Sequence, residues 1–194
     1  TYDYGDIAGC PPGGSAYTDL YRTASHQDQD GVSALLNRSY SYNCYSGKLN
    51  SSADPNSLVT GYIYDNYGRP TVITDGNYRK TVHTYNDAML WIVTQKDVEV
   101  FGDLRNGSVL HYDPLGRVRL ARQLERSVAD PEAAAADESL GIRTDTKYVY
   151  TLNRNETWMS NPYRTDEANV PTRGWTVKRL DKMGRACVEE WFSG

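Results

Sequence analysis

The sequence predicts an all-β protein made of consecutive antiparallel β-hairpins that form a curved or spiralling open sheet. A short sequence motif that predicts a strand, a turn and a second strand recurs six times, and we call it the repeat phrase. Its clearest copy is YIYDNYGRP at residues 62–70. Tyrosine dominates the aromatic residues at 16, against four Trp and two Phe, and it suits pleated sheets because its ring packs while its hydroxyl stays wet. Repetition of this kind indicates an array of similar hairpins rather than one unique active-site fold.

The first 38 residues are the least regular part of the chain. They open with TYDYGD, contain CPPGG at residues 10–14, and end near an apolar cluster of Val32, Leu35 and Leu36. We expect extended or strand segments broken by long loops over residues 1–38. The hairpin array then occupies residues 39–194.

The clearest copy of the phrase specifies a turn. Tyr62 and Tyr64 are two residues apart, so in a strand their side chains share one face. Asp65 suits the first position of a type I turn, because its carboxylate can accept a local backbone hydrogen bond. Gly68 falls where a three-residue hairpin needs positive φ, and the β-branched residues in RPTVIT at 69–74 predict the returning strand.

The other copies vary around this pattern. HYDPLGRVR from His111 and RLDKMGRAC from Arg179 keep the glycine, whereas YSYNCYSGK from Tyr40 places Gly47 one residue later and predicts a longer loop. The copies from Thr84 and Tyr148 match the motif least well, and we call them the worn repeats. In them Met89 and Arg154 replace the glycine, which should lower the stability by about 1 kcal/mol or force a different turn. We assign the structural repeat motif to Tyr62, Tyr64, Asp65, Gly68, Arg69, Tyr112, Asp113, Gly116, Arg117, Asp181, Gly184 and Arg185.

One insertion interrupts the array at residues 127–141, where the text SVADPEAAAADESLG is alanine-rich and acidic. Asp130 is a candidate N-cap, Pro131 suits the first helical turn, and Gly141 suits the stop. These signals predict a short helix near residues 131–139. A polar loop is the alternative, since helices this short are marginal without packing.

Composition limits the partners. The net charge is −4, from 21 basic and 25 acidic residues with no basic run, so we expect no nucleic acid. No apolar stretch approaches the roughly 18 residues of a membrane helix, so we expect no membrane span. The chain begins with Thr, and we expect it to be a segment of a larger protein.

The three cysteines show no metal-binding or redox spacing. A Cys10–Cys44 disulfide is one alternative, but the odd number and wide spacing favour free thiols. Cys187 follows the last turn, where we expect a small buried residue.

Candidate chemistry in the sequence is weak. His26, Asp28, Asp30 and Gly31 imitate the start of a calcium loop, but His26 stands in an acid position and the closing bidentate Glu is missing, which favours a polar turn. The remaining histidines, His83 and His111, lie on expected strands and are interpreted as packing residues. No nucleophile elbow, phosphate-binding loop or zinc motif occurs. We therefore predict no catalytic, cofactor-binding or metal-binding residue, and a protein that is not an enzyme.

The pattern Tyr-x-Tyr-Asp-x-x-Gly-Arg at Tyr62 to Arg69 resembles the YD repeat of the RHS family. That family includes bacterial RHS effectors, the shell-forming subunits of Tc toxins, and teneurins. The resemblance covers roughly residues 39–191. It implies hairpins that wind into a spiralling sheet and close into a hollow shell, which encloses a cargo in the toxins and belongs to an extracellular adhesion receptor in teneurins.

The resemblance implies a structural, non-catalytic role for this chain and a secreted or cell-surface location, most simply outside a bacterium. Six hairpins would form an arc of such a shell, so the expected partners are further YD-repeat segments, copies of the same chain at the sheet edges, and an enclosed cargo protein. The only part of this chain that resembles the family's self-cleavage site is Asp113-Pro114-Leu115-Gly116, and we assign no protease residue. The alternative is an adhesin-like module whose exposed Tyr and Trp side chains bind a glycan or a partner surface.

Overall fold

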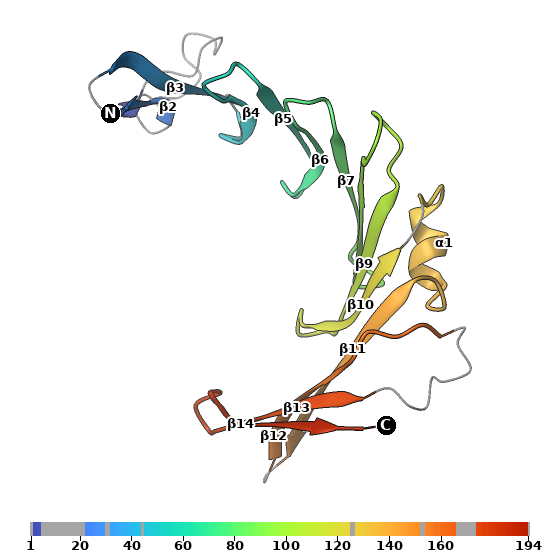
Figure 1. Ribbon diagram of the computed structural model, residues 1–194. Helices are drawn as coiled ribbons and strands as arrows, with labels where there is room; N and C mark the ends of the chain where they lie inside the picture. The colour runs from blue at the N-terminus through green and yellow to red at the C-terminus, as the bar shows by residue number, and fades with distance from the viewer. Residues whose placement is uncertain are drawn as a thin grey trace. The chain divides into compact units, whose positions relative to one another are not determined.

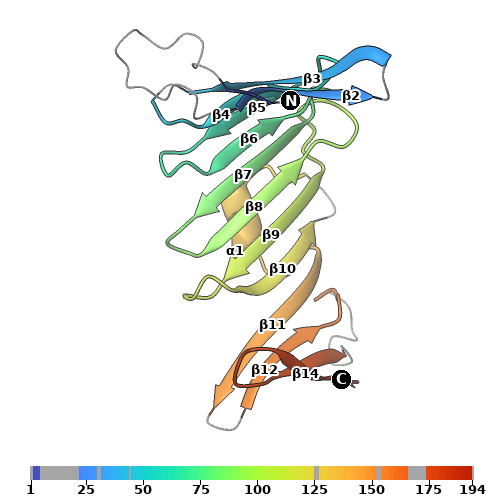
Figure 2. The same ribbon diagram turned by 90° about the vertical axis from the view of Figure 1, so that its left-hand side faces the viewer.

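The computed structural model describes residues 2–4, 22–29, 32–43, 45–124, 127–151, 154–165 and 174–193. Within these residues, fourteen strands follow one another in chain order through a single sheet, each antiparallel to the next where their pairing is resolved (Figures 1 and 2). The strands are β1 (Tyr2–Tyr4), β2 (Arg22–Gln29), β3 (Val32–Tyr42), β4 (Leu49–Ala53), β5 (Val59–Tyr64), β6 (Pro70–Thr74), β7 (Lys80–Asn86), β8 (Trp91–Lys96), β9 (Asn106–Tyr112), β10 (Val118–Leu124), β11 (Ile142–Thr151), β12 (Arg154–Ser160), β13 (Trp175–Leu180) and β14 (Ala186–Phe192).

The all-β class and the hairpin order predicted from the sequence are confirmed. By contacts the chain divides into two units, residues 1–82 with 99–102, and residues 83–98 with 103–194. No helix in the described part of the chain has the length and apolar character needed to cross a membrane.

The described part of residues 1–38 consists of strands, as expected. β2 pairs with β3, and His26 lies opposite Asn37 in that ladder. His26 and Asp28 are therefore strand residues, which does not match the loop backbone of a calcium site. Asp30, Gly31 and the CPPGG segment lie outside the described residues.

Connections in the sheet alternate between two strand ends, because consecutive strands run in opposite directions. The six copies of the repeat phrase all follow odd-numbered strands, from β3 to β13, so they share one strand end. A β-bulge is present at the clearest copy, where the β5–β6 register shifts between Ile63 and Tyr64.

Connections after even-numbered strands lie at the other end. They include tight turns after β4 and β6 and, after β10, the insertion that carries α1 (Pro131–Ala136). The helix predicted near residues 131–139 is thus confirmed and ends three residues earlier. Asp130 is its N-cap and accepts from the N–H groups of Glu132 and Ala133, while Gly141 (φ 79°) precedes β11.

The core of the second unit lies between α1 and one face of β8–β10, and Figure 2 shows the helix behind these strands. Val93 lies opposite Val109 in the ladder, and both are fully buried. Ala134 and Ala135 cover them from the helix, because small side chains let it approach the sheet closely. Trp91 and Leu124 complete this core.

Two predictions about the worn repeats are wrong. In the turn after β7 the left-handed residue is Leu90 (φ 55°) rather than Met89, because the Asn86 Oδ1 accepts from the Met89 N–H and shifts the turn by one residue. Arg154 is the first residue of β12 and pairs with Thr151, so it has a ladder position and does not replace the turn glycine.

Candidate functional site

The turn at Asp65 has the geometry that the sequence predicts. The Asp65 N–H donates to the Arg69 carbonyl at 3.0 Å, and the Gly68 N–H donates to the Asp65 carbonyl at 3.0 Å. Oδ1 of Asp65 accepts from the N–H groups of Tyr67 and Arg69 at 2.9 and 2.8 Å. Gly68 has a φ of 84°, which confirms the left-handed position.

Two further turns repeat this arrangement. Oδ1 of Asp113 accepts from the N–H groups of Leu115 and Arg117, both at 2.9 Å, and Oδ1 of Asp181 accepts from Arg185 at 2.9 Å. Gly116 and Gly184 have φ values of 77° and 78°. The predicted turn residues are therefore brought together in all three places.

In each of these turns the arginine at the fifth position also binds the aspartate side chain. The Nε atoms of Arg69, Arg117 and Arg185 lie 2.8, 2.7 and 2.8 Å from Oδ2 of their turn aspartates. This bond is the leading cause of the lowered pKa of Asp113; for Asp181 the leading cause is the backbone N–H of Arg185. Desolvation raises the pKa of Asp65, but the hydrogen bonds from Arg69 outweigh it, and the pKa is lowered.

The same turn occurs at two places that the sequence analysis missed, after β4 and after β6. Oδ1 of Asp54 accepts from Asn56 and Leu58 N–H groups at 2.8 and 2.9 Å, and Oδ1 of Asp75 accepts from Asn77 and Arg79 at 2.9 Å. Their left-handed positions are occupied by Ser57 (φ 64°) and Tyr78 (φ 63°). These turns could have been found in the sequence from an aspartate about every eleven residues, because the left-handed glycine is absent from them.

Tyr62 and Tyr64 lie on one face of β5, as predicted. Their ring centroids are 6.5 Å apart and the rings are stacked. The Tyr64 hydroxyl donates to the Leu49 carbonyl at 2.8 Å, and the Lys48 ammonium lies 5.3 Å from the Tyr64 ring centroid. Lys48 ends the preceding turn after β3, so this contact joins one repeat to the next.

An equivalent contact joins two repeats of the second unit. The Tyr148 hydroxyl donates to the Val118 carbonyl at 3.0 Å, and the Arg117 guanidinium lies 4.1 Å from the Tyr148 ring centroid. Burial is the main reason that the pKa of Tyr148 is raised. Arg117 thus binds Asp113 in its own turn and the tyrosine of the next odd-numbered strand. Tyr112 lies at the end of β9, where its N–H donates to the Leu90 carbonyl at 2.8 Å.

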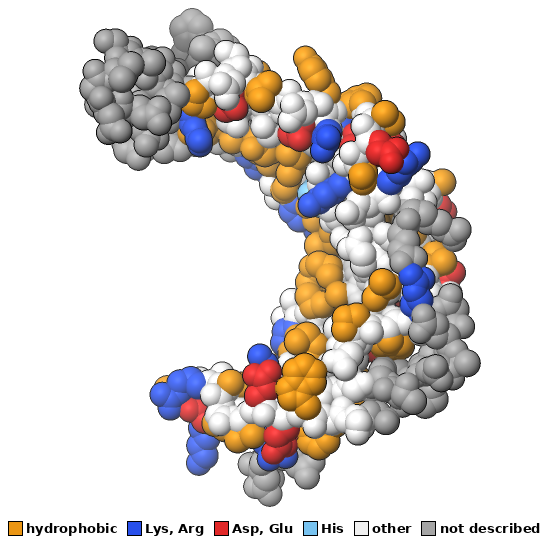
Figure 3. Space-filling view, viewed as in Figure 1, with side chains coloured by type: hydrophobic (Ala, Val, Ile, Leu, Met, Phe, Trp, Pro, Cys, Tyr) orange, Lys and Arg blue, Asp and Glu red, His pale blue; other side chains and the backbone are white. Residues whose placement is uncertain are grey.

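Large apolar side chains lie exposed near the tips of the turns that follow odd-numbered strands. Hydrophobic side chains, orange in Figure 3, lie among charged ones on the surface of the protein. The exposed tip residues are 69–84% accessible and comprise Tyr45, Tyr67, Met89, Leu115 and Met183. Such residues are available for contact with a partner.

His83 and His111 lie on strands β7 and β9 and contact neighbouring side chains, as expected for packing residues. His83 Nδ1 lies 3.0 Å from the Thr94 hydroxyl. His111 is 5% exposed, and its Nε2 lies 3.3 Å from a guanidinium nitrogen of Arg122. Among the described residues, no group of three or more His, Cys, Asp or Glu side chains is placed to hold a metal ion.

Arg122 is a buried residue that the sequence analysis did not identify. Its Nη2 donates to the carbonyls of Ala134 and Ala135 at 2.7 and 2.9 Å, and its Nη1 donates to the Asp137 carbonyl. These carbonyls belong to the C-terminal end of α1, where unpaired acceptors favour a cation. Arg122 therefore fixes the inserted helix to β10.

The prediction for Cys187 is wrong, because its side chain is exposed. Residues 186–189 lie on an exposed stretch of β14, and the thiol lies 3.2 Å from the Arg179 carbonyl. Cys10 and Cys44 lie outside the described residues.

No protein-family model matches the chain, and no curated protein matches it in sequence. The turn geometry and the contacts between repeats therefore carry the functional argument.

Proposed function

We propose that this chain is a structural, non-catalytic segment of a YD-repeat scaffold or shell that encloses or displays a cargo or adhesion domain. The RHS resemblance of the repeat phrase motivates this role. It also motivates a secreted or cell-surface location, most simply in a bacterium. The proposal includes no cofactor and no catalytic residue.

The observation that carries the proposal is the contact between successive repeats. Lys48 over Tyr64 and Arg117 over Tyr148 each join the end of one turn to the tyrosine of the following odd-numbered strand. An array built from such nearest-neighbour contacts extends by adding hairpins, without rearrangement of those already present. That property suits a wall or scaffold.

The proposed partners are further YD-repeat strands, from the same protein or from another copy of this chain. They would add to an edge of the sheet through main-chain hydrogen bonds. Negative-stain electron microscopy and light scattering over a concentration series of the purified chain test this step. Closed or extended assemblies are expected, and a monodisperse monomer at every concentration would refute edge pairing between copies.

The test of the scaffold role itself uses the full-length gene product. Deleting one complete repeat, such as residues 59–79, should leave the flanking repeats folded but release or expose the enclosed or displayed domain to protease. The undeleted protein is the control. Unchanged protease sensitivity of that domain would contradict a structural role.

A second function is favoured by the exposed aromatic side chains. Tyr45 and Tyr67 at turn tips and Trp191 on β14 present most of their surface to solvent, as an adhesin-like binding module would require. Replacing Tyr45 and Tyr67 with Ser separates the two functions. Loss of binding to a glycan array with unchanged circular dichroism would support the binding module and contradict a scaffold without ligands.

A further inference from the structure

A polar hollow lies on one face of β3–β5 in the unit formed by residues 1–82 and 99–102. Its volume is about 360 Å³, within the usual range for small-ligand sites. Tyr40 lies opposite Ser52 in the ladder, and Ser52 lies opposite Thr60, so the three side chains are cross-strand neighbours on one face. The space exists because two short hydroxyl side chains follow a long aromatic one.

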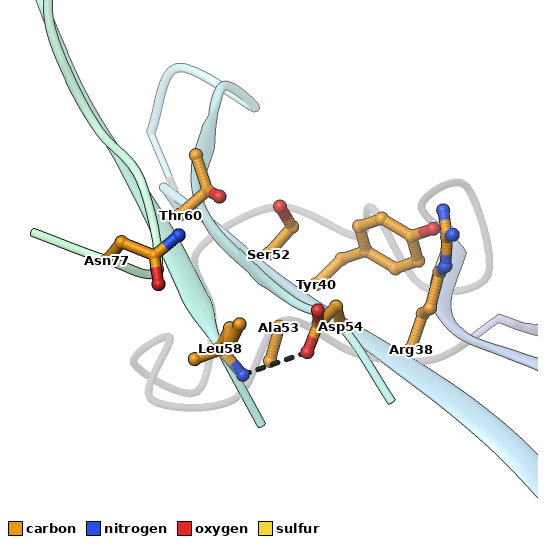
Figure 4. Close-up of a pocket in the computed structure, with 9 residues that line it drawn as sticks. Arg38, Tyr40, Ser52, Ala53, Asp54, Leu58, Thr60 and Asn77 are labelled. Carbon is orange, nitrogen blue, oxygen red and sulfur yellow. Dashed lines mark hydrogen bonds between the residues drawn. The ribbon is translucent and has the colours of Figure 1, made fainter. Parts of the chain in front are cut away.

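The opposite wall is formed by the turn after β6. A Cβ atom at Gly76 would lie 2.4 Å from the Leu58 Cβ, so only glycine lets this turn approach the turn after β4 so closely. The approach brings Asn77 to the rim. Figure 4 shows Asn77 on one side of the hollow and Arg38 and Tyr40 on the other.

The lining is polar and balanced in charge. Arg38 contributes a guanidinium and Asp54 a carboxylate, and Oδ1 of Asp54 is held by the Asn56 and Leu58 N–H groups, which fixes its orientation. The hydroxyls of Ser52 and Thr60 both donate and accept. A wholly apolar ligand would leave the Arg38 and Asp54 charges without polar partners, and an anion would meet the Asp54 carboxylate.

These groups match a neutral polyhydroxylated ring. The apolar face of a sugar ring can pack on the Tyr40 ring, and planar amide and guanidinium groups bind adjacent hydroxyls in pairs. We propose that this hollow binds one neutral hexose unit of a glycan. The proposal does not depend on the scaffold role, because a wall segment can carry a ligand site on its face.

The test titrates the ¹⁵N-labelled chain separately with galactose, glucose and mannose. Binding is measured from changes in the amide chemical shifts. At least one hexose should give saturable shifts clustered at residues 52–60 and 76–77. N77A, at an exposed turn, should weaken that binding about tenfold, because it removes one hydrogen-bonding group. N66A changes an exposed asparagine in the turn after β5, which does not line the hollow, and should leave the binding unchanged.

A second variant keeps the test decisive if N77A perturbs its turn. S52Q fills the hollow from the strand and should abolish the shifts while the circular dichroism spectrum stays the same. Absence of saturable shifts with all three hexoses would overturn the proposal, as would equal binding by S52Q. Tighter binding of glucuronate than of glucose would overturn the assignment of a neutral ligand.

Discussion

The left-handed glycine of the repeat turn gives a test of backbone strain without a steric clash. Gly116 has a φ of 77°, and a Cβ atom placed there would meet no heavy atom within 4 Å. Replacing Gly116 with Ala therefore adds no clash and forces a non-glycine residue into the left-handed region. The expected loss is about 1 kcal/mol of unfolding free energy.

Two matched variants isolate the cause. Asn tolerates the left-handed region better than Ala, so Gly116→Asn should lose roughly half as much. Gly61, within β5, also has open space around its Cβ position but no positive φ. Gly61→Ala should therefore be neutral or slightly stabilising, because alanine reduces the freedom of the unfolded chain.

Urea unfolding followed by circular dichroism and tryptophan fluorescence measures these differences. With a slope of about 2 kcal/mol per molar urea, a loss of about 1 kcal/mol lowers the midpoint by roughly 0.5 M at constant slope. Equal midpoints for Gly116→Ala and Gly61→Ala would refute the strain argument. So would an Asn variant that is less stable than the Ala variant.

Three further predictions concern the insertion and its anchor. Gly141→Ala combines a φ of 79° with a Cβ 2.2 Å from the Gln123 carbonyl oxygen. Its loss of unfolding free energy should therefore exceed that of Gly116→Ala by about 2 kcal/mol or more in the same urea assay. An equal loss in the two variants would contradict this. Arg122→Met removes the donor to the α1 carbonyls and should increase amide hydrogen exchange across residues 131–137. Arg119 is more exposed, and Arg119→Met should leave that exchange unchanged. Unchanged protection of these amides in Arg122→Met would show that other contacts hold the helix. Burial, then Arg119 and Arg122, lowers the pKa of His111 in the folded state, while Glu138 opposes them. The stability that neutral His111 contributes is therefore complete above about pH 6.5 and is lost as the pH falls below that value. His111→Gln should flatten the dependence of unfolding free energy on pH in this range, and an unchanged dependence would refute the contribution.

The glycine-marked turns were predictable because their geometry is set locally. Asp65 and Gly68 are three residues apart, and the hydrogen bonds that define the turn all lie within five residues. Glycine is not the defining residue of this turn. Asp54 and Asp75 make the same turn with Ser57 and Tyr78 in the left-handed position, so the aspartate acceptor is the more general signal.

The burial of Arg122 could not be predicted from its own strand. The segment VRLARQL alternates Leu120, Arg122 and Leu124 on one face, and a charged residue at the middle position suggests a solvent-exposed side chain. It is buried because the insertion supplies carbonyl acceptors from residues 134–137, which are distant in sequence. The Cys187 error has the same origin, because nothing in the local pattern of β14 shows whether another element covers it.

The insertion also shows why a repeat with uneven spacing can still form a regular sheet. Lys48 and Tyr64 are 16 positions apart, whereas Arg117 and Tyr148 are 31 apart, yet both pairs make the same contact between repeats. The contact lies at the strand end that carries the odd-numbered turns, and the extra residues leave from the opposite end, after β10. Segments can therefore be added at one strand end without disturbing the contacts that join the repeats at the other. For a scaffold, this separates the end that holds the array together from the end that is free to diversify.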